Sequence, residues 1–212
     1  MKPGKFITLE GGEGAGKSTN APWIADYLRA QGKTVLVTRE PGGTTVSEAI
    51  RGVLLSPELP AMDADTELLL MFAARNEHLR TKILPALAQG TWVICDRFTD
   101  ATYAYQGYGR GISLERIAAL ENWVQGTLRP DYVILFDLDV ETGMARAQAR
   151  GQADRFEQEH TEFFTRIRAG YQARAAAMPA HYPQIDAAQP LEAVRAQLQA
   201  LLERMLQADQ PA

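Results

Sequence analysis

The sequence predicts an α/β fold in which helices cover both faces of a central five-stranded parallel sheet. Short apolar segments alternate with longer segments of helical periodicity along most of the chain. The apolar segments are continuous, which is typical of strands that are buried on both faces. Strands that alternate with helices favour parallel pairing, because a crossover helix returns the chain to the same edge of the sheet. We therefore expect three layers.

The first strand is predicted at residues 6–10, a continuous apolar run that leads into a glycine-rich turn. A helix is expected at about 17–31, and the run Thr-Val-Leu-Val-Thr predicts a second strand at 34–38. A short helix is expected at about 45–55. A long helical segment is predicted over 63–88, because apolar side chains recur there at helical spacing.

The third strand is predicted at residues 92–95, and the thiol of Cys95 is expected to be buried and structural, as most thiols in apolar runs are. The glycine-rich stretch 107–111 is short and is expected to form a loop. A helix is predicted over 113–125. Ser113 is the expected N-cap, because its hydroxyl can accept from amides that the first turn leaves free.

The rest of the chain repeats the alternation. A strand is predicted at 132–136, followed by a helix at 140–149 and a longer helix at 156–177. The segment 182–185 is a weak last strand, and 191–206 is the closing helix. No internal repeat or low-complexity linker divides the chain, so one domain of 212 residues is expected.

Composition narrows the class of protein. Apolar residues make up 46% of the chain, and 22 Lys and Arg against 26 Asp and Glu give a net charge of −4. This balance argues against a general nucleic-acid or membrane-surface binder. The single cysteine fits a reducing compartment. No apolar run approaches the ~18 residues of a membrane span and no signal-peptide pattern is present, so we expect a cytoplasmic protein.

A phosphate-binding motif follows the first strand. It consists of Gly11, Gly12, Glu13, Gly14, Ala15, Gly16, Lys17 and Ser18, and it matches G-x-x-x-x-G-K-[ST] between a strand and a helix. Glycines let the loop curl so that backbone amides face phosphate oxygens, and the helix N-terminus adds positive potential. Lys17 can follow the β- and γ-phosphates, and the Ser18 hydroxyl can bind Mg²⁺.

Two further loops end strands at the same edge of the sheet, where ligands gather in parallel α/β folds. Asp96 could orient a metal's water shell or the acceptor, and Arg97 could hold an acceptor phosphate; alternatively, the two form a surface ion pair. Arg39 begins the second loop, Arg-Glu-Pro-Gly-Gly, which suits close approach of the backbone to a ligand but is also compatible with an ordinary turn.

Several arginines on predicted helices have two interpretations. From the residues alone, Arg51 and Arg75 are expected to be solvated helix charges, and Phe72 is expected to be a core residue. Arg150 and Arg155 flank a short polar segment that could close over the phosphates and offset charge in the transition state. The alternative for these two is a basic helix C-terminus, which is itself favourable.

Together these motifs resemble bacterial thymidylate kinases of the P-loop nucleoside monophosphate kinase family. The resemblance rests on the runs 6–18, 38–43, 95–98, 104–107, 129–131 and 154–157, which occur in order over nearly the whole chain. It implies a P-loop kinase fold with a small lid at about 147–157. It also implies ATP-dependent phosphorylation of dTMP to dTDP with Mg²⁺, and a homodimer. ATP and dTMP would be its small-molecule partners.

The resemblance assigns roles to residues of this chain. ATP would be bound by the phosphate motif with Thr19, Gln189 and Pro190. The dTMP site would consist of Glu10, Glu13, Arg39, Pro41, Arg51, Met71, Phe72, Arg75, Arg97, Thr102, Tyr105 and Gln106. Lys17, Asp96, Arg97, Arg150 and Arg155 would be catalytic, and Ser18 and Asp96 would hold the metal. Whether Met71 or Phe72 stacks on thymine stays open, because the two are adjacent.

Two other functions remain as alternatives. One is a kinase of the same class for another nucleotide or nucleoside. The other is a nucleotide-dependent switch, which the absence of an N-K-x-D sequence for reading guanine disfavours.

Overall fold

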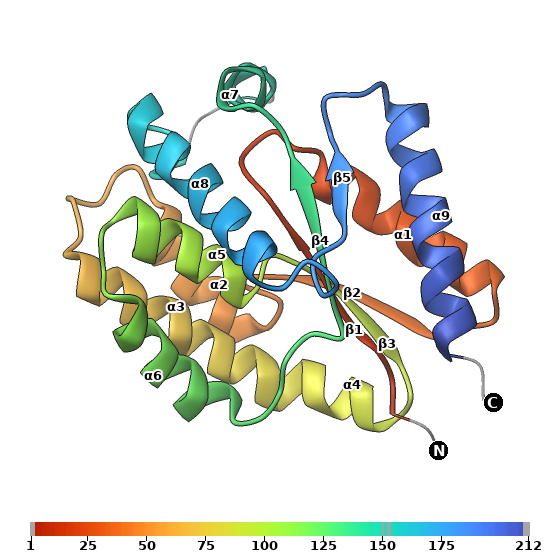
Figure 1. Cartoon of the computed structure of the whole chain (residues 1–212). Helices are drawn as coiled ribbons and strands as arrows, with labels where there is room; N and C mark the ends of the chain where they lie inside the picture. The colour runs from red at the N-terminus through yellow and green to blue at the C-terminus, as the bar shows by residue number, and fades with distance from the viewer. Residues whose placement is uncertain (1–2, 150, 152–153, 210–212) are drawn as a thin grey trace.

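The computed structural model describes residues 3–149, 151 and 154–209, and within them a five-stranded sheet forms the centre of the molecule (Figure 1). The strand order is β2-β3-β1-β4-β5, and all neighbouring strands are parallel. The bounds are Phe6–Glu10 for β1, Val35–Arg39 for β2, Trp92–Asp96 for β3, Tyr132–Asp137 for β4 and Gln184–Asp186 for β5. The α/β prediction is confirmed, and each strand lies within two residues of its predicted position.

Helices connect the strands and cover both faces of the sheet. Their bounds are Lys17–Ala30 for α1, Thr45–Leu55 for α2, Ala64–His78 for α3, Leu84–Ala88 for α4, Thr99–Thr102 for α5, Leu114–Gln125 for α6, Val140–Gln148 for α7, Thr161–Ala177 for α8 and Leu191–Asp209 for α9. Two π-helical segments, η1 at Leu79–Ile83 and η2 at Tyr103–Gly109, continue α3 and α5.

The two faces of the sheet have separate cores. On one face, α1 and α9 bury side chains such as Leu28 and Leu202 against the strands (Figure 1). On the other face lie α3, α4, α5, α6 and α8, and Ile167 of α8 packs with Leu135 of β4. Cys95 is fully buried and unpaired on this second face, which confirms its structural interpretation, and burial raises the pKa of its thiol well above the usual value.

Strand order places the site. Successive crossovers from β1 lead first toward β2 and β3 and later toward β4 and β5, so the direction of winding reverses next to β1. In open parallel sheets, a crevice forms outside the carboxyl ends of the strands at such a reversal. The loop after β1 and the residues that end β3 therefore meet at this crevice.

The prediction of a loop at 107–111 is wrong, because most of this stretch belongs to η2. The glycines that predict a loop here allow close packing instead. A Cβ on Gly109 would lie 2.6 Å from the ring of Phe163 in α8, and one on Gly107 would lie 2.7 Å from Leu114. Tertiary packing against α8 therefore overrides the local glycine signal.

Two helix starts also differ from expectation. The helix predicted from 156 begins at Thr161, because the Asp154 carboxylate accepts the amides of Phe156 and Glu157 and holds a turn before it. Ser113 does precede α6, but its hydroxyl donates to Glu115 and caps no backbone amide. The predicted helix over 63–88 is continuous but contains η1.

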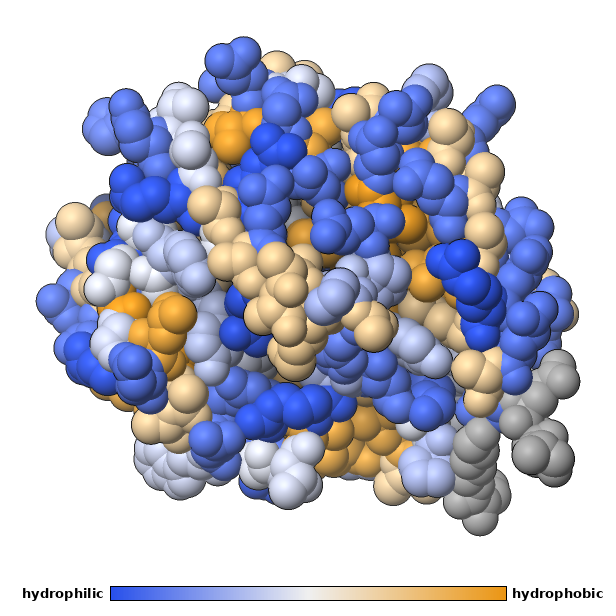
Figure 2. All heavy atoms as spheres, in the orientation of Figure 1, coloured by the Kyte–Doolittle hydropathy of each residue, from blue (hydrophilic) through white to orange (hydrophobic). Residues whose placement is uncertain are grey.

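The surface is mixed. Hydrophilic residues dominate the face in Figure 2, with scattered apolar residues between them. Among the described residues, no helix is both long enough and apolar enough to cross a membrane. Large exposed apolar side chains gather on α2, α3 and α6, and Trp123 of α6 is 79% exposed.

Candidate active site

A cavity of about 660 Å³ opens at the carboxyl ends of the strands. It extends from the loop after β1, past the end of β3, to side chains of α2, α3, α5 and η2. The segment around 154–157 and the residues after β5 close its sides. Its size suits a small organic ligand.

The loop after β1 has the backbone that the phosphate motif requires. Gly11, Gly14 and Gly16 have φ angles of 133°, 66° and 87°. A Cβ on Gly11 would lie 2.3 Å from the carbonyl oxygen of Phe136, and one on Gly14 would lie 2.1 Å from that of Gly143. Only glycine can occupy these positions, and α1 begins directly afterwards at Lys17. The result is a turn with a helix N-terminus, which favours anions.

Lys17 is buried and lines the cavity. Its ammonium donates to the carbonyl oxygens of Gly11 at 2.9 Å and Gly12 at 2.7 Å. Burial, helped by the nearby charge of Arg97, lowers the pKa of Lys17 to about 8. An anionic ligand in the loop would offset both effects, so the side chain is arranged to gain a partner on binding.

Ser18 and Asp96 present oxygen atoms beside this lysine. The Ser18 hydroxyl donates to Asp96 Oδ2 at 2.6 Å, and both residues line the cavity. A hydroxyl and a carboxylate fit Mg²⁺, which prefers oxygen ligands and takes only one or two from protein in phosphate sites. No cluster of three or more His, Cys, Asp or Glu within the described part of the chain offers an all-protein metal cage.

Arg97 lies between the phosphate loop and the part of the cavity that α3, α5 and η2 line. It follows β3 and adopts a φ of 67°, which only a constrained non-glycine residue maintains. Its guanidinium donates to the Gly11 carbonyl at 2.8 Å and to Glu13 Oε1 at 2.6 Å. Tyr105 donates to the same Glu13 oxygen at 2.8 Å, and its ring lies 5.0 Å below the guanidinium. Tyr171 of α8 contacts Arg97 from behind at 3.3 Å.

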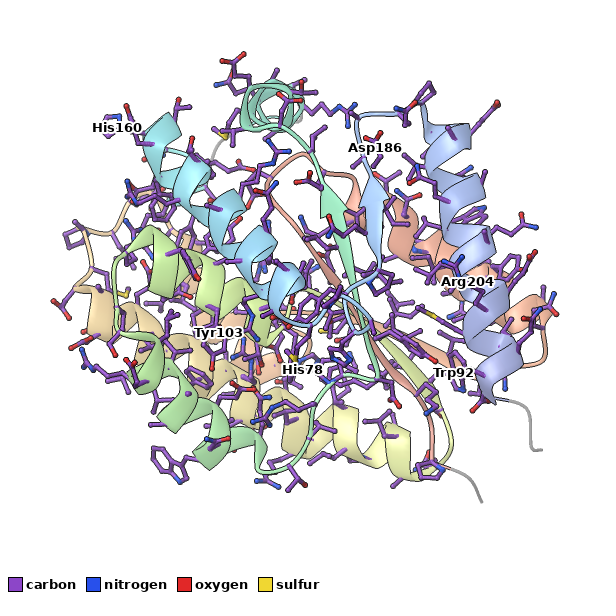
Figure 3. All side chains as sticks on the ribbon, viewed as in Figure 1. His78, Trp92, Tyr103, His160, Asp186 and Arg204 are labelled. Carbon is purple, nitrogen blue, oxygen red and sulfur yellow. The ribbon has the colours of Figure 1, made fainter. Side chains whose placement is uncertain are left out.

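Arg75 is buried, so its interpretation as a solvated helix charge is wrong. Only 2% of the residue is exposed, and its Nε donates to Glu40 Oε2 at 2.7 Å. Its Nη2 donates to the Thr102 hydroxyl at 2.9 Å, whereas Nη1 is buried and makes no hydrogen bond. His78, labelled in Figure 3, is fully buried and contacts the other oxygen of Glu40 at 3.1 Å. An unpartnered guanidinium nitrogen beside a cavity is suited to an incoming anion.

Met71 and Phe72 occupy different environments. Met71 lines the cavity, whereas Phe72 does not and is 2% exposed in a core with Leu68 and Ile117. The prediction of Phe72 as a core residue is therefore confirmed. Its ring supports Arg75 from below at 4.9 Å.

Glu10 lies beneath the cavity. It is fully buried and accepts the amide of Phe98 at 2.7 Å and the hydroxyl of Tyr171 at 3.1 Å. Burial and the nearby charge of Asp100 raise the pKa of Glu10 to about 8, although Arg97 opposes this shift.

The charged side chains on the β2 side of the cavity are less buried than Arg75 and Lys17. Arg51 of α2 lines the cavity, is partly buried, and donates to the carbonyl of Pro41 at 2.8 Å. Burial lowers its pKa, and so does the charge of Arg39. Arg39 is largely exposed and pairs with Glu48 at 3.0 Å.

The segment before α8 turns its arginine away from the cavity. Arg155 Nη2 donates to Glu67 Oε2 at 2.7 Å, and Arg155 Nε donates to the carbonyl of Leu54. Arg150 lies outside the described residues. Asp154 and Glu157 line the cavity instead.

The opposite side of the cavity is formed by residues after β5. Asp186 ends this strand (Figure 3) and accepts from the Gln189 amide at 2.8 Å. Gln189 and Pro190, which the resemblance assigns to ATP, line the cavity, and Arg146 of α7 lines it while donating to the Ala187 carbonyl at 2.9 Å.

Most candidate residues lie on one cavity. Those that line it are Glu13, Gly14, Ala15, Gly16, Lys17, Ser18, Thr19, Arg39, Pro41, Arg51, Met71, Arg75, Asp96, Arg97, Thr102, Tyr105, Gln106, Gln189 and Pro190. The described candidates that do not line it are Glu10, Gly11, Gly12, Phe72 and Arg155. Each of these residues contacts one that does line the cavity.

Sequence reasoning missed the acidic side chains that orient residues in the part of the cavity lined by α3, α5 and η2, which we call the acceptor half. Glu40 holds Arg75, and Glu67 holds Gln106. Glu67 falls in the first turn of a helix, where an acidic residue is favourable for electrostatic reasons alone, so its position hid its burial. The one available signal was its place beside Leu68 in the apolar stripe.

Comparisons with known proteins agree on one family. The family described as "Thymidylate kinase" matches residues 9–198. The chain is 61% identical to a thymidylate kinase of Pseudomonas fluorescens over 204 residues, which cover 96% of this chain and 97% of the relative. It is 60% identical to one of Alcanivorax borkumensis over 202 residues, 95% of this chain and 97% of the relative. The crystal structure of thymidylate kinase from Ehrlichia chaffeensis is similar with a TM-score of 0.75 and 34% identity, over 94% of this chain and 99% of that one.

Proposed function

The chain belongs to the thymidylate kinase family, and from this premise we propose how its residues carry out the family's reaction. It is a kinase that phosphorylates dTMP to dTDP with ATP, a step that supplies dTTP for DNA synthesis. One observation carries the proposal for the site. Lys17 of the phosphate loop and the arginines Arg75 and Arg97 line a single cavity, so donor and acceptor phosphates can meet inside it.

ATP binds with its phosphates in the loop after β1. Backbone amides and the N-terminus of α1 hold the phosphate oxygens, and Lys17 leaves the carbonyls of Gly11 and Gly12 to follow the γ-phosphate. The adenine lies between Arg146 and the residues Gln189 and Pro190.

dTMP binds in the other half of the cavity. Arg75 and Arg97 hold its phosphate, with Arg75 Nη1 as a free donor. Met71 is the side chain that stacks on thymine, because it lines the cavity and Phe72 does not. Tyr105 supports the deoxyribose and excludes a 2′-hydroxyl, and Thr102 and Gln106 read the base edge. A monophosphate is largely ionised near pH 7, so no general base is required.

Ser18 and Asp96 would hold Mg²⁺, which would supply charge neutralisation for the phosphates. The chain's own part is to position the two substrates in line and to exclude water, which limits wasteful hydrolysis of ATP.

The segment at about 147–157 acts as a lid on a single domain of 212 residues. In the described structure Arg155 pairs with Glu67. We propose that Arg155 and Arg150 move onto the transferring phosphoryl group and stabilise its charge, since the loop itself carries no arginine.

The protein is also proposed to be a cytoplasmic homodimer. The exposed apolar side chains of α2, α3 and α6 offer a face for a second copy, with Trp123 and Leu69 as its largest exposed groups. A reducing compartment suits the single cysteine.

A substrate panel tests the function. ADP release from ATP is measured with each nucleoside monophosphate as acceptor and with none. The proposal requires acceptor-dependent release with dTMP, and preference for another monophosphate would instead indicate a related kinase. Tight nucleotide binding with no acceptor-dependent release would favour a switch.

A further inference from the structure

We propose that Glu67 is the residue that sets base specificity, because it fixes the orientation of the Gln106 amide. The inference rests on the proposed function and adds a positioning residue to the dTMP site. Glu67 does not line the cavity, so it acts through Gln106. Its effect is to decide whether a hydrogen-bond acceptor or a donor faces the base.

Glu67 is a fully buried carboxylate on α3. Arg155 donates to its Oε2 at 2.7 Å, and Arg110 contacts both of its oxygens at 3.3 Å. Because two guanidinium groups donate to both of its oxygens, the carboxylate serves as a hydrogen-bond acceptor at this site.

Gln106 must therefore turn a donor toward Glu67. Its Nε2 donates to Glu67 Oε1 at 2.8 Å, and Gln106 is 1% exposed while lining the cavity. Reversing the amide would place two acceptor oxygens against each other in a buried site, which costs a hydrogen bond and adds repulsion. Among the described residues, the contact with Glu67 through Nε2 is the hydrogen bond that the Gln106 side chain makes. The Gln106 oxygen is the amide atom left for a ligand.

A fixed acceptor selects the base by its hydrogen-bond pattern. Thymine and uracil carry an N3–H donor, whereas cytosine carries an unprotonated N3, which is an acceptor. An oxygen that cannot turn away repels cytosine and binds the imide of thymine. The neighbouring Thr102 hydroxyl accepts from Arg75 and so keeps its own hydrogen for a base carbonyl.

The test compares dUMP with dCMP, because these two differ only on the base edge. Dissociation constants for dTMP, dUMP and dCMP are measured by calorimetry with the wild-type protein and with Glu67→Gln. A glutamine at position 67 can donate as well as accept, so Gln106 is free to flip. We expect the preference for dUMP over dCMP to fall by about tenfold or more, with dTMP following dUMP.

Loss of the Arg155 contact does not confound this ratio. Arg155 is proposed to act on phosphates, which are the same in the three ligands, so its release changes all affinities by one factor. An equal change for all three would show a structural role for Glu67 and overturn the inference. The effect should also vanish in a Gln106→Ala background, since the amide that Glu67 orients is then absent.

A second variant of Glu67 and a control variant at another buried carboxylate complete the test. Glu67→Asp keeps the charge for both arginines but has a shorter reach to Gln106, so a smaller fall in the ratio is expected even if Glu67→Gln does not fold. Glu121→Gln is the matched control: this buried carboxylate of α6 pairs with Tyr103 and Arg129 away from the cavity, and its variant should keep the wild-type ratio. An unchanged ratio in both Glu67 variants overturns the inference, whereas absence of dTDP formation by the wild type would defeat the proposed function instead.

Discussion

The phosphate-binding part of the donor half is formed by one continuous segment, whereas side chains from several elements meet to form the acceptor half. Residues 11–18 supply the phosphate loop through backbone geometry, in which Gly11 and Gly14 leave no room for a side chain. In the acceptor half, the buried carboxylates of Glu40 and Glu67 hold Arg75 of α3 and Gln106 of η2, and Arg97 after β3 pairs with the partly buried Glu13. The donor half should therefore lose a side chain at little cost in stability, whereas losing one in the acceptor half should lower stability as well as binding.

Lys17→Ala should give the largest effect and test the donor half alone. We expect kcat/KM to fall by about 10³-fold or more, because an electrostatic contact to the transferring phosphoryl group is lost. Thermal stability should be unchanged or slightly higher at pH 7, because burial already disfavours the charged lysine. Turnover assays and melting curves check both results. Lys33→Ala, at a lysine outside the cavity, is the control, and a folded Lys17→Ala that keeps most activity would refute the assignment.

Arg155→Ala tests whether the lid serves the chemistry rather than either half. We expect kcat to fall by about 10²-fold with little change in the KM for dTMP, as for a contact made mainly at the transition state. Steady-state kinetics at saturating ATP separate the two parameters. Arg168→Ala removes a half-buried arginine that pairs with Asp137 and should leave kcat unaltered. A change in KM alone would contradict the lid role.

Arg75→Met should damage stability and binding together, in contrast to Lys17→Ala. Removing one partner of the buried Arg75–Glu40 pair leaves a carboxylate without its main counter-charge, which costs about 3–5 kcal/mol, and dTMP loses a phosphate ligand. Urea unfolding and calorimetry measure the two losses. Adding Glu40→Gln to Arg75→Met should restore part of the stability but none of the affinity for dTMP. Recovery of both would argue against a direct contact between Arg75 and dTMP.

Gly109→Ala tests the support of the acceptor half. A methyl group would enter the ring of Phe163, which is itself packed against Tyr105 and Phe164, and we expect a loss of about 1–3 kcal/mol in unfolding free energy. Gly52→Ala is the matched control, because nothing lies within 4 Å of its added Cβ on a helix. That variant should gain about 0.5–1 kcal/mol. Equal unfolding free energies for the two variants would rule out the tight packing of η2 on α8.

Glu10→Gln should change the free energy of unfolding little near pH 5 and progressively more as the pH rises. The pKa of Glu10 is raised from 4.5 to about 8, so the folded protein holds a proton that the unfolded chain releases. Wild-type stability from this group is complete below pH 4.5 and declines as the pH rises through about 8. Glutamine does not titrate, so the variant should gain relative to the wild type over that window. Denaturant unfolding at pH 5, 7 and 8.5 measures the difference in unfolding free energy between the variant and the wild type. A difference that does not change with pH would show that the pKa of Glu10 is not raised in the folded protein.

The sequence by itself determined the sheet, the phosphate loop and the family. A buried strand, a helix start and a glycine turn are local patterns, and residues 11–18 are contiguous, so their chemistry can be read without knowing the fold. The resemblance placed most acceptor residues, but the residues alone predicted Arg75 to be solvated.

Only the tertiary structure decided how the acceptor half is organised. Glu40 lies 35 residues from Arg75, and Glu67 lies 39 residues from Gln106, so no local pattern reveals either pair. The same holds for the glycines of η2, which signal a loop locally but permit contact with α8 once the chain has folded. A buried charge without a partner is unfavourable, and in this protein the partners are brought together only by folding, because they are distant in sequence.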